Sequence, residues 1–179
     1  MDNVVRLVPA RDGGDMTALD DYRAAVPPHL DRWALVDPAR LLRDLRQRMP
    51  LTAGQSVLCQ VERPATDQLL VAHTVVWRGR GPADEMEARD DVEEAMRGIG
   101  HRDWVWDDDV RLSSSVVVVV IRDGRAVTRS SDFHLAYALR YANNPFQALL
   151  GDLIVVTPHG WIAVCDDVAG LEPTSTPEP

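Results

Sequence analysis

The sequence predicts an α/β (α+β) fold in which a single mixed central sheet is flanked by helices. The first observation is the run Val116–Ile121, five valines followed by an isoleucine. This run is typical of a strand buried on both faces, because a one-sided strand would alternate. The second is that helical and strand-like patterns follow one another along the chain. The third is the polar segment Arg122–Val127, which leaves the buried strand at its carboxyl end, where α/β proteins often bind ligands.

Length and composition indicate one globular domain with two tails. A chain of 179 residues can bury a sizeable core. Residues 1–30 show little periodicity, so we expect a partly flexible arm, to which Val4–Val8 could add a short edge strand. Residues 31–168 form the expected globular domain, and residues 169–179 the expected disordered tail, because they have too little apolar surface to order themselves.

The first half of the domain predicts a helix followed by a hairpin. Asp37 and Pro38 are a strong helix start, an N-cap followed by proline at the first helical position, and Pro50 ends the helix. Ser56–Val61 and Gln68–Trp77 have the pattern of two strands joined by a short turn. Arginines between the apolar positions of the helix predict a basic outer face. They are Arg40, Arg43, Arg46 and Arg48.

A second helix and a long connection lead to the buried strand. Asp84–Arg97 has helical spacing, whereas residues 98–110 have no clear period and are expected to form a loop that contains Trp104 and Trp106. The apolar positions expected on this helix are Met86, Val92, Ala95 and Met96.

After the buried strand the pattern predicts a third helix and two more strands. Ser131–Asn143 has helical spacing and ends at Asn144-Pro145. Leu153–Val156 is the next buried strand, and a turn at residues 157–160 leads to Trp161–Val164, the last strand expected.

Charge and hydropathy exclude several classes of partner. The net charge of −9 argues against a nucleic-acid binder, which needs a basic surface. No apolar run approaches the roughly 20 residues that cross a bilayer, so we expect no membrane partner. The N-terminus lacks a basic region followed by an apolar core, and a cytoplasmic location is therefore expected.

The two cysteines, Cys59 and Cys165, lie far apart in strand-like segments. We expect both to be buried reduced thiols rather than a disulfide or a metal-binding pair. No CxxC motif or paired His/Cys spacing exists, which argues against a structural zinc site.

Three segments resemble the RadC-type branch of the JAB/MPN metalloprotein family. They are Ser56–Val61 with Leu69–Val76, then Val116–His134, then Leu149–Val156. The likeness extends from about Val36 to Val164 and lies in the pattern of elements rather than in identities. It implies a JAB/MPN-like frame in which zinc is held by a His-x-His pair after the central strand and a Ser-x-x-Asp pair at the next helix.

At the positions of the two histidines this chain has Ile121-Arg122-Asp123, and at the second pair it has Ser131-Asp132-Phe133-His134. The spacing fits, but an isoleucine cannot bind metal. One interpretation keeps Asp123 and His134 as an altered metal pair, with Ser131 orienting water. A catalytic zinc normally has three protein ligands. A further donor, such as Asp109 or His159, would therefore be needed, and Glu62 is the loose candidate for the family's catalytic glutamate.

The simpler interpretation needs no metal. Asp123-Gly124 favours a tight turn, because both residues tolerate positive φ. Ser130 or Ser131 then caps the following helix, and Asp132 complements its dipole.

The function expected from the sequence is a non-catalytic, JAB/MPN-like binding or scaffold module in a cytoplasmic assembly, without cofactor. A protein partner would bind to the basic face of the first helix and to the Trp104/Trp106 loop. The alternative is a metal-dependent hydrolase with an altered ligand set, which uses zinc and acts on an isopeptide, peptide or phosphoester bond. A third hypothesis is a small-molecule pocket lined by Trp77, Trp104 and Trp106.

Overall fold

The computed structural model describes residues 5–6, 35–64, 67–79, 81–99, 114–143 and 149–176. The strands are β1 (Val5–Arg6), β2 (Gln55–Glu62), β3 (Leu69–Arg78), β4 (Ser114–Ile121), β5 (Leu149–Thr157), β6 (Gly160–Ala163) and β7 (Val168–Gly170). The helices are α2 (Pro38–Arg48), α3 (Glu85–Gly98) and α4 (Ser130–Asn143). None of these helices is long and apolar enough to cross a membrane.

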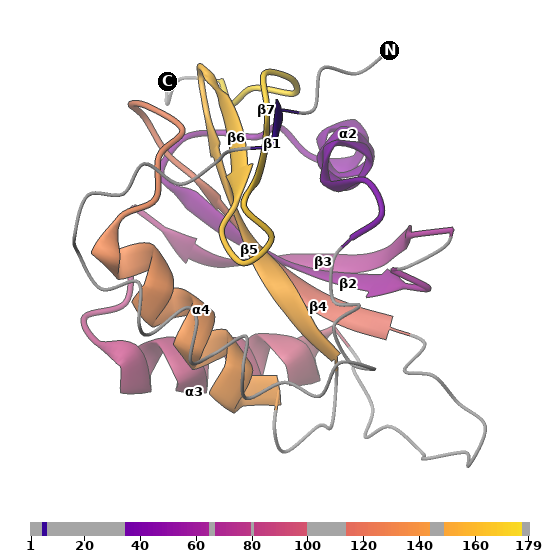
Figure 1. Cartoon of the computed structure of the whole chain (residues 1–179). Helices are drawn as coiled ribbons and strands as arrows, with labels where there is room; N and C mark the ends of the chain where they lie inside the picture. Colours follow the sequence, from indigo (N-terminus) through magenta and orange to yellow (C-terminus); the bar gives the residue numbers. More distant parts are fainter. Residues whose placement is uncertain are drawn as a thin grey trace.

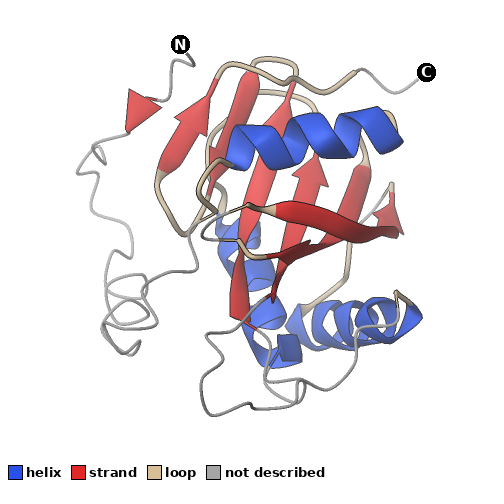
Figure 2. Cartoon of the chain, turned by 90° about the vertical axis from the view of Figure 1, so that its right-hand side faces the viewer, coloured by secondary structure: helices blue, strands red, loops and turns tan. Residues whose placement is uncertain are grey.

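All of the strands belong to one sheet of order β1-β7-β6-β5-β4-β2-β3. The β4–β5 pair, joined through α4, is parallel, whereas the other neighbours are antiparallel. Helix α2 covers one face of the sheet, and α3 and α4 lie together on the other (Figures 1 and 2). The predicted α/β class with a mixed central sheet is confirmed.

Strand β4 is an interior strand, as its run of valines predicts. It pairs with β2 on one side and with β5 on the other. Val117, Val119 and Ile121 pack on the α2 side, and Val116 and Val118 on the side of α3 and α4. Each of these side chains is at most 1% exposed. Both faces of β4 are therefore covered, which explains the lack of alternation.

Helix α2 begins as the sequence predicts. The Asp37 side chain accepts a hydrogen bond from the Arg40 amide at 2.9 Å, and Pro38 is the first helical residue. A residue from the hairpin turn also holds this end. The Gln68 side-chain amide accepts from the Asp37 N–H at 2.9 Å and donates to the Asp37 carbonyl at 2.7 Å. Gln68 thereby ties the start of α2 to the start of β3.

The arginines of the predicted basic face are mostly engaged within the chain. Arg40 lies 3.9 Å from Asp44, and Arg43 lies 3.1 Å from Asp37. Arg48 donates to the Leu70 carbonyl of β3. Nearby carboxylates and a backbone carbonyl therefore offset much of the charge expected on this helix.

One of the apolar residues expected on α3 is not buried. Met86 is 61% exposed, whereas Ala88, Val92 and Met96 are buried. These three residues are spaced four apart and form one stripe against the sheet, and position 86 falls outside it. The Trp77 indole donates to the Asp91 carboxylate at 2.7 Å and links β3 to α3.

The C-terminal segment corrects two expectations. A further strand, β7, follows β6, so Trp161–Val164 is not the last strand. Strand β1 pairs with β7 at the edge of the sheet, which agrees with the edge strand expected within Val4–Val8. The tail expected to be disordered is hydrogen-bonded to the domain as far as Thr176, whose amide donates to the Leu51 carbonyl at 2.8 Å. Main-chain pairing, which needs little apolar surface, orders this segment.

Both cysteines are free, as expected. Cys59 is fully buried in β2, and burial raises the pKa of its thiol to about 12. Cys165 is half-buried in the turn between β6 and β7.

Candidate functional site

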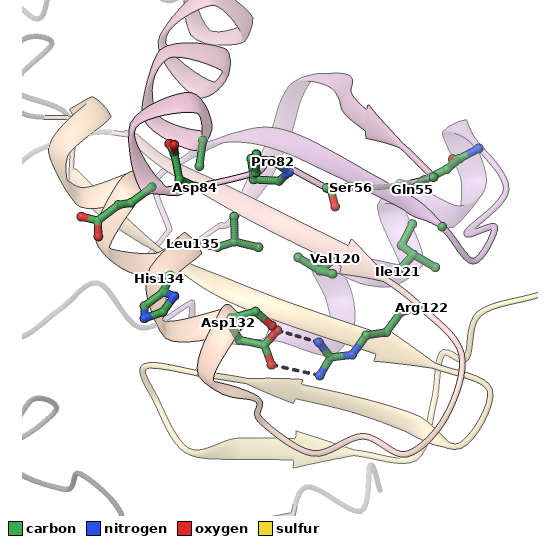
Figure 3. A pocket seen from close by; sticks show the side chains of 17 residues that line it. Gln55, Ser56, Pro82, Asp84, Val120, Ile121, Arg122, Asp132, His134 and Leu135 are labelled. Atoms are coloured by element: carbon green, nitrogen blue, oxygen red, sulfur yellow. Dashed lines mark hydrogen bonds and ion pairs between the residues drawn. The ribbon is translucent and has the colours of Figure 1, made fainter.

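A cavity of about 380 Å³ lies at the carboxyl end of β4, between the starts of α3 and α4 (Figure 3). Strand β2 runs antiparallel to β4, so its first residues reach the same end of the sheet: Gln55 pairs with Ile121 and Ser56 with Val120. The loop between β3 and α3 supplies the remaining wall. The lining residues are Gly54, Gln55, Ser56, Gly79, Gly81, Pro82, Ala83, Asp84, Glu85, Ala88, Val120, Ile121, Arg122, Ser131, Asp132, His134 and Leu135.

A buried ion pair forms one side of the cavity. Arg122 contacts both carboxylate oxygens of Asp132, with Nη1–Oδ1 at 2.6 Å and Nη2–Oδ2 at 2.9 Å (Figure 3). The Asp132 side chain is 1% exposed and that of Arg122 is 14% exposed. Bidentate contact in a dry setting is the strong form of this interaction.

The same pair shapes the loop between β4 and α4. Asp132 accepts a further hydrogen bond from the Arg129 amide at 2.7 Å, and Arg122 donates to the Val127 carbonyl at 2.7 Å. Asp132 thus caps the start of α4 from within its first turn. The expectation that Asp132 complements the helix dipole agrees with this arrangement.

The candidate site residues are Asp123, Ser131, His134 and Glu62, and two of them line the cavity. Ser131 and His134 are exposed side chains on the first turns of α4, and both line it. Asp123 is an exposed residue of the adjoining loop and is not among the lining residues. Gly124 has φ +97°, which agrees with the tight turn expected at Asp123-Gly124.

Glu62, the loose candidate for the family's catalytic glutamate, does not line the cavity. Glu62 pairs with Ser114, at the start of β4, whereas the cavity lies beside Ile121, at its end. Seven residues of strand at about 3.3 Å each separate the two ends by about 23 Å. The antiparallel register therefore places Glu62 at the end of these strands that lies away from the cavity.

No group of three or more potential metal ligands occurs among the described residues. His159, one suggested further donor, lies in the turn after β5, where its amide donates to the Thr157 hydroxyl at 3.1 Å, and it does not line the cavity. The other donor, Asp109, and the loop with Trp104 and Trp106 lie outside the described residues.

Trp77, the third member of the expected aromatic pocket, is 8% exposed and does not line the cavity. Its indole is held by Asp91. It therefore belongs to the packing between β3 and α3.

The lining of the cavity combines apolar, uncharged polar and charged side chains. Val120 and Leu135 form its apolar part, and Ser56, which is 8% exposed, adds a hydroxyl. The Asp84 carboxylate points toward α3 (Figure 3), where it accepts from the Glu87 amide at 2.9 Å as the N-cap. Because Arg122 offsets Asp132, the ion pair adds little net charge. The cavity is suited to binding a group of mixed polarity.

Nucleophilic catalysis needs a hydroxyl or thiol beside a base. Within the described residues, the side chains of Ser131 and His134 form no hydrogen bond or ion pair with another residue. Among the described residues, Ser131 is therefore not hydrogen-bonded to a base.

The sequence reasoning missed Ser56, Pro82 and Arg122 as parts of the site. The antiparallel pairing of β2 with β4 would have placed Ser56 opposite Val120, but a strand pattern does not reveal its partner. The Arg122–Asp132 pair had one signal, an arginine and an aspartate on either side of a turn. No protein-family model matches this chain, and a search of curated proteins finds no match.

Proposed function

We propose that this chain is a non-catalytic binding module with a JAB/MPN-like frame, which holds a protein partner in a cytoplasmic assembly. The partner contacts the cavity at the carboxyl end of β4 and the surface around it. The Arg122–Asp132 ion pair is the observation that carries this proposal.

The ion pair occupies the region in which the resemblance implies zinc. Every oxygen of the Asp132 carboxylate is already bonded, to Arg122 and to the Arg129 amide. A guanidinium cation in this place repels a second cation, and breaking a buried pair is costly. These contacts support a site that binds without metal.

Exposed apolar side chains next to the cavity support a protein as the ligand. Met86, 61% exposed, follows the lining residue Glu85 in α3. Val127, 50% exposed, belongs to the loop that Arg122 holds. Large apolar side chains beside a pocket are a common feature of protein interfaces.

Zinc titration of the purified protein tests the proposal. We expect calorimetry and elemental analysis after dialysis to find well below one equivalent of zinc, in the wild type and in Asp123→Ala and His134→Ala alike. One tightly bound zinc that either substitution removes would contradict the proposal and favour the metal-dependent hydrolase.

A variant of the ion pair provides the positive control for the zinc measurement. Arg122→His introduces an imidazole, a good zinc ligand, beside the Asp132 carboxylate. If this variant gains zinc binding that the wild type lacks, the assay detects zinc at this place, and the wild-type result is a true negative.

A further inference from the structure

A groove between the end of α2 and the edge strand β3 differs in charge from the molecule as a whole. It has a volume of about 380 Å³, and its lining includes Met49, Pro50, His73, Val75 and Arg78. None of the described residues that line it is a carboxylate, although the chain has a net charge of −9. The groove is therefore a basic place on an acidic protein.

A second arginine lies at the other end of this stretch of β3. The Arg48 guanidinium, from the last turn of α2, donates to the Leu70 carbonyl, and its Nη1 lies 3.5 Å from the Val71 carbonyl. These carbonyls orient the guanidinium without neutralising it. In the described part of the chain neither Arg48 nor Arg78 forms an ion pair, and both are exposed. Two positive charges thus bracket residues 72–75.

The positive charge reaches the half-buried imidazole of His73. Burial lowers the pKa of His73, and the charge of Arg48 lowers it further. The charged and titratable groups around this ring are Arg48 from α2, Arg78 from β3, and Cys59, its register partner on β2. An anion bound in the groove would oppose the field of the arginines and raise the pKa of His73 again.

The outer side of β3 offers main-chain groups next to these charges. Strand β3 is the last in the sheet and lies below α2 in Figure 1. Its register with β2 is regular over residues 72–75 and shifts on either side of them. Alternate residues of an antiparallel edge strand direct their N–H and C=O groups away from the neighbouring strand. Because bulges limit pairing at an edge, only a short segment fits here.

We propose that residues 72–75 and the groove beside them bind an acidic, extended segment of a protein partner. The segment adds a short strand to β3, and its carboxylates face Arg48 at one end and Arg78 at the other. Main-chain pairing supplies affinity, and the two charges supply specificity. An acidic peptide fits better than nucleic acid, because the net charge of −9 repels a long polyanion.

This surface is separate from the cavity of the proposed function. Met49 and Val75 pack on the α2 side of the sheet, whereas the cavity lies between the starts of α3 and α4. The inference therefore goes beyond the proposed function and does not depend on whether the cavity binds zinc.

The test uses isotope-labelled full-length protein and a capped hexapeptide, Glu-Val-Thr-Val-Thr-Glu. NMR follows the amides of residues 70–78 and the imidazole of His73. We expect saturable shifts of these amides and a higher pKa of His73 in the saturated complex, because the bound carboxylates stabilise the imidazolium. The signals of His159, in the turn after β5, should not respond.

Matched variants test the role of charge. Arg78→Gln should weaken peptide binding by about two- to fivefold, the range expected for an exposed ion pair. Arg125→Gln, an exposed arginine in the loop between β4 and α4, should leave the affinity unchanged. A peptide with glutamine in place of both glutamates should bind more weakly than the original, and the difference between the two peptides should shrink as salt is added.

Two N-methylated peptides test the addition of a strand. One carries methyl groups on its second and fourth amides, and the other on its third and fifth. Because alternate amides of an added strand face β3, one of these peptides should keep most of its affinity and the other should lose it.

Five results would overturn the proposal. Millimolar peptide could cause no saturable shift, the glutamine peptide could bind equally well, or the two methylated peptides could behave alike. Tighter binding of a single-stranded oligonucleotide at the same amides would make this a nucleic-acid site. Shifts that depend on protein concentration without peptide would mean that a second copy of the chain covers β3. None of these results measures zinc, so failure here is separate from failure of the proposed function.

Discussion

Arg122 is a single residue on which the end of β4, the next loop and the start of α4 all depend. Its guanidinium bonds Asp132 and the Val127 carbonyl, and its main-chain amide donates to the Val156 carbonyl of β5 at 3.0 Å. The sequence shows only an arginine after a buried strand. Its role follows from where α4 returns to the sheet, which places Asp132 within reach.

Arg122→Ala should reduce the free energy of unfolding by about 3–5 kcal/mol, because it leaves the Asp132 carboxylate buried without its charged partner. Urea denaturation measures this change. The exposed Arg125→Ala in the same loop is the control and should change stability by less than about 0.5 kcal/mol. Equal effects of the two substitutions would mean that the ion pair contributes nothing specific.

The contact that Gln68 makes with Asp37 could likewise not be predicted from the sequence. It is 1% exposed and has φ +46°, an uncommon conformation for glutamine. Its side chain bonds both main-chain groups of Asp37, 31 residues earlier. No local pattern predicts such a contact, whereas the N-cap of Asp37 itself depends on neighbours three residues away and was predicted.

At the scale of the elements, the parallel pair β4–β5 leaves no room for a side chain at one position. The register shifts between Val116 and Val118, and here Gly151 approaches β4 so closely that an added Cβ would overlap the Val116 carbonyl. A glycine is therefore required for close backbone approach, as is common at irregular points of a sheet.

Gly151→Ala should destabilise the protein by more than about 3 kcal/mol, since backbone on both strands would have to move. Thermal and urea unfolding measure this loss. Gly98→Ala, at the last residue of α3, provides the matched control, because a Cβ at Gly98 meets no atom within 4 Å. This alanine should leave stability unchanged or raise it by up to about 1 kcal/mol. A tolerated alanine at position 151 would contradict the observed register.

Helix α3 shows that apolar residues alone do not define the buried face of a helix. Its spacing predicts the helix, and Met86, Val92, Ala95 and Met96 are its expected apolar positions. The buried stripe consists of Ala88, Val92 and Met96, whereas Met86 is 61% exposed. Position 86 lies on another side of the helix from this stripe.

At the scale of the whole molecule, a buried carboxyl group links global stability to pH. Asp152 in β5 is 2% exposed and accepts from the amides of Cys165 at 2.8 Å and Asp166 at 3.3 Å. Burial raises the pKa of Asp152 from its ordinary value of 3.8 to about 7, and the charge of Asp166 adds to the effect. The folded protein therefore binds this proton more tightly than the unfolded chain.

The contribution of Asp152 should thus favour the folded state at low pH and be lost as pH rises from about 4 to about 7. Other carboxylates add their own pH dependence, so the measurement is the difference in unfolding free energy between Asp152→Asn and the wild type. We expect the stability of the variant relative to the wild type to rise across this range and to level off above it. Asp123→Asn, an exposed control, should show no such trend.

The sequence by itself determined those features that depend on neighbours close along the chain. The N-cap and proline of α2, the hairpin of β2 and β3, and the interior position of β4 all follow from local spacing or from hydrophobic pattern. These features can be predicted without knowledge of the fold, because they reflect backbone hydrogen bonding and burial within single elements.

Only the tertiary structure decided which residues meet. The antiparallel register of β2 with β4 separates Glu62 from Ser131 and brings Ser56 to the cavity. The return of α4 pairs Asp132 with Arg122, and backbone pairing with residues 51–53 orders a tail whose composition predicts disorder. The physical reason is the same in each case: strand register and long-range hydrogen bonds depend on the relative placement of distant segments, which periodicity and composition do not encode.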